Sequence, residues 1–145
     1  MADSPRKVYL GHIADCLRRI TKGNGYNTDA GALVTLEPAP KVAGDAAFVT
    51  VVWEGQARAT DAAVARTHRA TTVNIVAKVP ATFTEAQAVV DAIAQDIELA
   101  LADQQYRFPT GYQFPLYQSA SPDAAAAADG WVAVVVVVTG NIPIR

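Results

Sequence analysis

The chain has 145 residues, 51% of them hydrophobic and 18% charged, with a formal net charge of −2 at pH 7. This length and apolar content predict a single globular domain over residues 1–145 with a substantial core. The weak negative charge argues against nucleic-acid binding as the main activity. Cys16 is the sole cysteine, which excludes an intrachain disulfide and a cysteine-based metal site.

The hydrophobic pattern contains neither a secretory signal nor a membrane span. The N-terminal residues lack an apolar stretch behind a basic region. The most apolar run, residues 131–140, is about ten residues long, whereas a membrane helix needs roughly 20. We therefore expect a soluble protein, made in a reducing cytoplasm, with no membrane among its partners.

The first predicted element is an amphipathic helix over residues 5–22. Its apolar residues recur at three- and four-residue steps, the spacing of one helical face: Tyr9, Leu10, Ile13, Cys16, Leu17 and Ile20. Gly23 or Gly25 can end the helix in a left-handed conformation. Cys16 lies on the apolar stripe, where a thiol behaves as a small hydrophobe and not as a nucleophile.

Three strands and a hairpin follow. We expect strands over residues 31–38, 48–53 and 70–79, the first of them cut off by Pro38. The alanine- and arginine-rich residues 55–69 are predicted to form the distal part of a long hairpin with little apolar anchoring.

A second helix is predicted over residues 84–103. Thr84 and Gln87 form a capping-box pattern at its start. The segment carries five carboxylates and no Lys or Arg, a net −5, whereas residues 1–22 have five basic and two acidic residues, a net +3. We therefore expect the two helices to be electrostatic complements.

The C-terminal third is an aromatic loop followed by strands. Residues 106–117 carry five aromatic residues and two prolines. A short strand is expected at residues 116–119, then an alanine-rich loop through Gly130, and then the final strand over residues 131–140.

The final strand is apolar on both faces. Val132, Val134, Val136 and Val138 would line one face, and Trp131, Ala133, Val135 and Val137 the other. Two helices can cover one face of a small sheet, so the other face requires a second sheet, the long loops or another copy of the protein. We infer a homo-oligomer in which different surfaces of each copy meet head to tail and close a ring.

The order of these elements, α-β-β-β-α-(β)-β, predicts an α+β fold. We expect a mostly antiparallel β-sheet with two amphipathic helices packed on one face. The result is a sandwich of two layers.

No pattern of residues indicates a catalytic, metal or cofactor site, so no enzyme is predicted. His12 and His68 lie in different elements, whereas a zinc site needs three or four ligands. Asp91 and Glu98 share the solvent face of the second helix, without a nearby histidine for acid–base chemistry. The glycine-rich residues 23–29 follow a helix and have no lysine at the P-loop spacing.

Five residues are candidates for a subunit or partner interface: Arg58, Arg66, Arg69, Tyr112 and Phe114. The arginines, with His68, make the one locally basic surface. It would meet an acidic partner protein or a nucleic-acid backbone, or else be a solvated hairpin tip. The two aromatic residues belong to a loop in which only Arg107 interleaves with the rings, which favours loop packing or a subunit interface over a base-stacking platform.

The order of elements and several local strings resemble the tail terminator, or tail completion, proteins of long-tailed bacteriophages. The matching pieces span nearly the whole chain. They are the opening helix over residues 8–20, Gly25-Tyr26-Asn27-Thr28-Asp29-Ala30-Gly31 leading into a strand at 33–36, the strands at 49–53 and 71–79, the acidic helix with Asp96-Ile97-Glu98-Leu99-Ala100-Leu101, and the closing hydrophobic strand.

The resemblance implies a small α+β structural protein of the virion that carries no catalytic residue. It implies a homohexameric ring at the tail–neck junction, assembled in the host bacterial cytoplasm. Such a ring binds the tail tube protein at the head-proximal end, stops tube polymerisation, and gives the neck or head-completion protein a docking surface. Genomic DNA would pass through the lumen without sequence-specific binding.

Three other functions remain open. The first is another phage neck or tail-tube ring component. The second is a small α/β ligand-binding domain or enzyme with its pocket between the aromatic loop and the sheet. The third is a nucleic-acid-binding module that uses the arginine hairpin, whose sign would be a steeply salt-dependent affinity for DNA.

Overall fold

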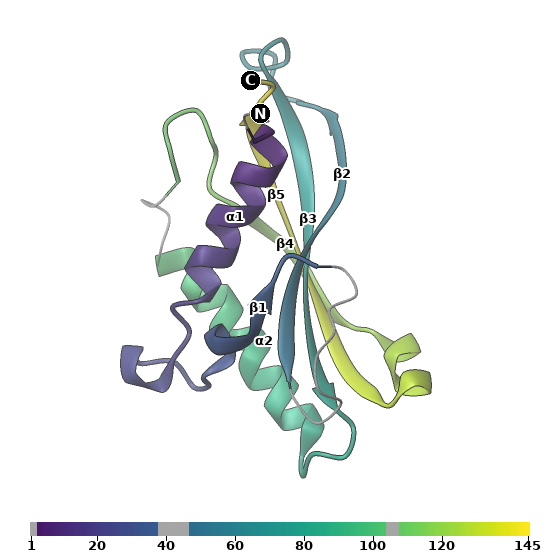
Figure 1. Cartoon of the computed structure of the whole chain (residues 1–145). Helices are drawn as coiled ribbons and strands as arrows, with labels where there is room; N and C mark the ends of the chain where they lie inside the picture. The colour runs from purple at the N-terminus through teal and green to yellow at the C-terminus, as the bar shows by residue number, and fades with distance from the viewer. Residues whose placement is uncertain (1–2, 38–46, 104–107) are drawn as a thin grey trace.

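The computed structural model describes residues 3–37, 47–103 and 108–145, and it confirms the α+β class (Figure 1). A five-stranded sheet carries two long helices. The helices are α1 (Pro5–Leu17) and α2 (Ala86–Asp103), and the strands are β1 (Val34–Thr35), β2 (Phe48–Arg58), β3 (His68–Pro80), β4 (Leu116–Pro122) and β5 (Trp131–Pro143). No helix among the described residues is both long and apolar enough to cross a membrane.

The sheet has the strand order β1-β2-β3-β5-β4. β1 and β2 are parallel and the other pairs are antiparallel, so the sheet is mixed but mostly antiparallel, as predicted. β3 and β5 pair from His68 opposite Pro143 to Pro80 opposite Trp131. The valine-rich strand β5 is therefore internal to the sheet, and β4 lies at the edge beyond it.

Both helices cover the same face of the sheet, which confirms the predicted two layers (Figure 1). The register places Val51 beside Ile75 and Ile75 beside Val136, so these side chains point to one face. The strand residues of the core are Val49, Val51, Val73, Ile75, Ala77, Val79, Val136, Val138 and Ile142. They pack against the apolar stripes of α1 and α2, which exclude water from this face.

α1 is shorter than predicted. Its start is capped by Ser4, whose hydroxyl oxygen accepts the backbone N–H of Lys7 at 3.2 Å. The helix ends at Leu17, and the chain then forms a separate 3-10 helix, Lys22–Asn24. Gly25 closes this 3-10 helix at φ 92°, so the expected left-handed glycine ends a different element.

The start of α2 also differs from the prediction. The helix begins at Ala86, and Glu85 directly before it has φ 57°. The backbone N–H of Val89 donates to the Glu85 carbonyl at 3.1 Å, so Glu85 is the N-cap. The capping box predicted from Thr84 and Gln87 is wrong, because that pattern requires Thr84 itself at the N-cap.

The strands differ from the prediction mainly at their ends. Residues expected to open the first strand form a 3-10 helix, Ala30–Leu33, which leaves β1 with two residues. β2 and β3 both extend toward the hairpin, whose tip is residues 59–67. A bulge between Trp53 and Gly55 lets β2 continue past its predicted end.

The C-terminal third contains more regular structure than expected. β4 reaches Pro122, and the alanine-rich residues form a 3-10 helix, Ala124–Asp129, that contacts β5. Residues 106 and 107 of the predicted aromatic loop lie outside the described residues, as does Pro38, the expected end of the first strand.

Candidate subunit interface

The loop after α1 is fixed by a carboxylate of α2. Asp96 is fully buried and accepts hydrogen bonds from the backbone N–H of Asn27 at 3.0 Å, the N–H of Thr28 at 2.8 Å and the Thr28 hydroxyl at 2.7 Å. Three donors offset the cost of removing a carboxylate from water. In the sequence Asp96 is one acidic residue among several, but its place three residues after Ile93 and four before Ala100 puts it beside the apolar stripe of α2. That spacing signals burial, and it does not identify the partners in the anchor loop.

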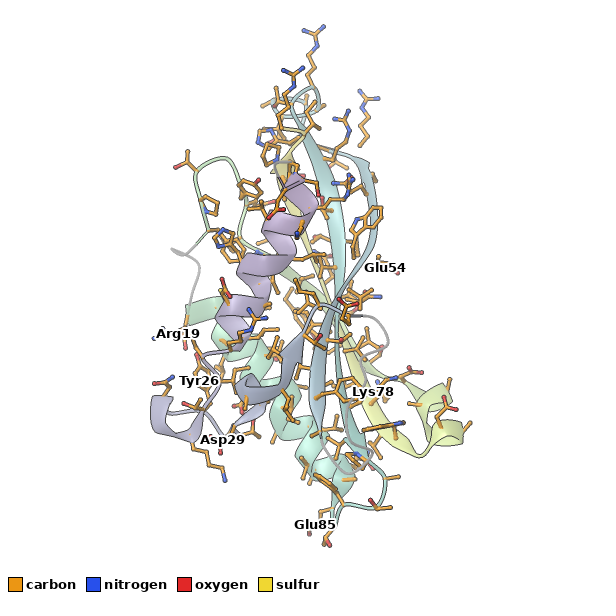
Figure 2. The ribbon with its side chains drawn as sticks, viewed as in Figure 1. Arg19, Tyr26, Asp29, Glu54, Lys78 and Glu85 are labelled. Atoms are coloured by element: carbon orange, nitrogen blue, oxygen red, sulfur yellow. The ribbon has the colours of Figure 1, made fainter. Side chains whose placement is uncertain are left out.

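Gly31 completes this anchor loop, residues 25–31. Its N–H donates to the Ile20 carbonyl at 2.9 Å, and a Cβ at this position would lie 2.5 Å from the Arg18 carbonyl oxygen. The close approach of the two backbones therefore requires glycine. Figure 2 labels Tyr26 on this loop, beside the end of α1. Asp96 and the anchor loop belong to two of the several strings on which the family resemblance was drawn, and the structure brings these two into contact.

The three predicted arginines lie at one end of the molecule, where both chain termini also lie (Figure 1). Arg58 and Arg69 are register partners in the last strand pair before the hairpin tip, and Arg66 belongs to the tip itself. Arg58 and Arg66 are exposed, and their side chains form no hydrogen bond or ion pair with the described residues. Arg69 is half-buried and donates to the His68 carbonyl at 3.0 Å.

Arg6 adds a fourth arginine to this end, which sequence analysis missed. Its guanidinium carbon lies 5.1 Å from the centroid of the Trp53 ring, and it donates to Gln56 Oε1 at 3.0 Å. These contacts join the start of α1 to β2, so Arg6 is occupied within its own chain. No spacing signal could have found it, because the contact joins residues far apart in the sequence.

The structure separates the two aromatic candidates. Tyr112 is half-buried, and its ring stacks on Tyr9 with the centroids 6.3 Å apart. The carbonyl oxygen of the preceding Gly111 lies 3.0 Å from His68 Nε2, which connects the loop to the start of β3. Tyr112 thus packs within its own subunit, whereas Phe114 lines a groove between α2 and β4.

Tyr9 of α1 places a phenol hydroxyl in the core of the protein. Its hydroxyl has no hydrogen-bond partner among the described residues. Burial raises the pKa of the Tyr9 hydroxyl above its usual value, so the group stays neutral. Gly140 of β5 makes room for it, because a Cβ there would clash with the Tyr9 hydroxyl.

The groove between α2 and β4, the α2–β4 groove, has a volume of about 220 Å³. Phe114, Leu116 and Tyr117 form one wall, and Leu101 and Glu98 of α2 form the other. Among the described residues that line it, Glu98 is the one with a charge, and it is half-buried. The helical spacing predicts Glu98 on the solvent face of the second helix, and no local pattern signals the groove that it lines.

The sheet face turned away from α1 and α2 is a second candidate surface and is named the opposite face. Its central residues are Val52, Asn74, Val76, Val135 and Val137. All five are half-buried, and none belongs to the core. At one end of this face the Phe48 and Trp131 rings pack edge to face, with their centroids 5.3 Å apart. Ala133 is buried near the 3-10 helix Ala124–Asp129.

The centre of the opposite face is uncharged. Glu54 and Lys78 lie on the side of the strands away from α1 and α2 (Figure 2), on either side of this centre along β2 and β3. The residues between them are valine, threonine and asparagine. Such a surface suits packing against another protein better than it suits binding an ion.

The two histidines and the carboxylates are also candidate metal ligands. The described residues contain no group of three or more His, Cys, Asp or Glu side chains that could hold a metal ion. The His12 ring packs near Phe108 with the centroids 5.9 Å apart, whereas His68 contacts Gly111 and the Thr67 hydroxyl. The two histidines therefore have separate surroundings.

The expected charge complementarity between the helices does not produce ion pairs. The two ion pairs of the described residues are Lys7–Asp3 at 3.1 Å and Arg18–Asp15 at 2.7 Å, both near or within α1. The carboxylates of α2 form no ion pair in this part of the chain.

Comparison of the sequence with protein-family models finds no match, and comparison with curated proteins finds none.

Proposed function

We propose that this protein is the tail terminator of a long-tailed bacteriophage, a structural subunit whose homohexameric ring caps the head-proximal end of the tail tube. The ring stops tube polymerisation and offers the neck or head-completion protein a docking surface. Genomic DNA passes through its lumen without sequence-specific contacts. The first support for this proposal is the family resemblance, which includes residues 25–31 and 96–101. These two segments are in contact, because Asp96 accepts hydrogen bonds from the backbone of the anchor loop.

The observation that carries the proposal is the opposite face of the sheet. Its centre is an uncharged surface on three adjacent strands, and neither α1 nor α2 packs on it. Complete burial of a valine side chain contributes about 1.5–3 kcal/mol, and these half-buried valines realise only part of it. A second protein surface would supply the remainder, as expected for a subunit that assembles.

β4 supplies a second surface, as a closed ring requires two different surfaces on each copy. This edge strand is exposed along its length, and Tyr117 and Leu116 are 56% and 39% exposed. An edge with exposed apolar residues is a site where another chain can pack.

The proposal is tested by negative-stain microscopy of the purified protein, alone and with tubes polymerised from the tail tube protein of the same phage. We expect six-fold rings, bound to one end of each tube, and shorter tubes when the ring is added during polymerisation. A matched sample with a Val137→Asp variant, which charges the opposite face, is expected to leave the tubes uncapped.

Two outcomes contradict the proposal. Monomers that leave both tube ends bare would show that the protein is not a ring-forming tail component. Rings that stack into tubes of their own, or that bind only the neck proteins, would identify a different ring of the virion.

A further inference from the structure

The α2–β4 groove combines an apolar wall with one carboxylate. Leu116 and Tyr117 expose much of their surface at its rim, beside Phe114. Glu98 is half-buried among these residues and has no ion-pair partner among the described residues. The groove thus presents apolar surface and a negative charge side by side, so it favours a ligand that carries both a cation and apolar atoms.

The hairpin tip has the complementary chemistry. Its residues 62–65 are Ala-Ala-Val-Ala, and Arg66 follows them with an exposed guanidinium that binds no described residue. An arginine side chain offers an apolar stem and a charged end, which matches an apolar wall with a carboxylate.

The hairpin tip also has hydrogen bonds of its own, which favour one turn conformation. The Asp61 carboxylate accepts the backbone N–H of Ala63 at 3.0 Å, and the His68 N–H donates to the Val64 carbonyl at 2.9 Å. A preformed tip loses little conformational entropy on binding, which favours association.

We propose that the hairpin tip of one copy docks in the α2–β4 groove of a second copy, with Arg66 against Glu98. The inference rests on the proposed function only in that both require the chain to self-associate. The tip and the groove are different surfaces of one subunit, so the contact is heterologous and can repeat around a ring. Arg66 and Glu98, which have no ion-pair partner among the described residues of their own copy, thereby pair with each other across the contact.

The test is a charge swap between two copies. Glu98→Lys and Arg66→Glu are each expected to weaken self-association at least about tenfold in analytical ultracentrifugation, because each places like charges together. An equimolar mixture of the two variants is expected to recover assembly. In alternating order the Glu98→Lys groove meets the Arg66→Glu tip, and the unchanged groove meets the unchanged tip.

Controls separate the contact from general charge effects. Asp91→Lys and Lys22→Glu make the same charge reversals at exposed positions outside the groove and the tip, and are expected to leave association unchanged. Tyr117→Ser removes an apolar wall without changing charge, and should weaken association several-fold while thermal unfolding stays close to wild type.

Each outcome of the charge swap supports or contradicts either the proposed contact or the proposed function. If the wild type assembles and either charge variant assembles equally well, or if the mixture does not recover, the proposed contact is wrong while the proposed function stands. If the swap behaves as expected but tubes remain uncapped, the contact is right and the tail-terminator role is wrong. A wild-type protein that is monomeric at all concentrations overturns both.

Discussion

The two faces of β5 contain the same residue type in different surroundings. Val136 and Val138 point toward the helices and are fully buried, whereas Val135 and Val137 point away and are half-buried. Both pairs lie in the middle of one strand, between β3 and β4. The difference comes from the helices, which cover one face only, so composition alone does not tell which valines stabilise the subunit and which are available to a partner.

The largest effect is expected on the helix-covered face. Val136→Asp places a carboxylate among the core residues, and the free energy of unfolding should fall by more than about 4 kcal/mol, because a buried charge without a partner is costly. Urea unfolding followed by circular dichroism measures this. A near wild-type midpoint would show that this face is not the core.

The next largest loss of stability is expected when the hydrogen bonds between α2 and the anchor loop are removed. Asp96→Ala removes the acceptor of three hydrogen bonds at Asn27 and Thr28 and is expected to cost about 3 kcal/mol. Asp96→Asn retains an acceptor and should cost less. Hydrogen exchange should show faster exchange of the Asn27 and Thr28 amides, and unchanged protection at both would contradict the role assigned to Asp96.

Charging the opposite face should affect assembly more than folding. Val137→Asp is expected to reduce the free energy of unfolding of the subunit by only about 1–2 kcal/mol, since the side chain retains access to water, while self-association is lost. The near-isosteric Val137→Thr is the control and should preserve both. A collapse in stability as large as that of Val136→Asp would remove the distinction between the two faces.

The smallest effect at neutral pH is expected at a buried polar group of the helix-covered side. Tyr9→Phe removes a hydroxyl that has no partner among the described residues, so the free energy of unfolding at pH 7 should change by less than about 1 kcal/mol. Retaining the ring preserves its stacking on Tyr112.

The same variant predicts a pH dependence. Because burial raises the pKa of the folded Tyr9 hydroxyl, the unfolded chain releases this proton first, near its ordinary value of about 10. The wild type should therefore lose stability as pH rises from 9 to 11, and Tyr9→Phe should lose less. Equal losses in the two proteins would show that Tyr9 does not ionise differently on unfolding.

The candidate interface was predictable only in part. The exposure of Arg58 and Arg66 follows from a basic segment with few large apolar residues. Tyr112 and Phe114 were indistinguishable in the sequence, because both are aromatic residues of one loop. Their separation depends on Tyr9, which approaches Tyr112 from a helix more than a hundred residues earlier.

Elements of the fold that depend on local periodicity were determined by the sequence itself. The apolar stripes of both helices follow from spacings of three and four residues, and the valine strand follows from a continuous run of β-branched residues. The packing of two helices on a mostly antiparallel sheet follows from the order of the elements. Only the tertiary structure decided where α1 and α2 begin and end, which face of β5 is covered, which backbone groups Asp96 binds, and that Glu98 lines a groove. Each of these depends on atoms that folding brings together from distant positions, and no local pattern records such contacts.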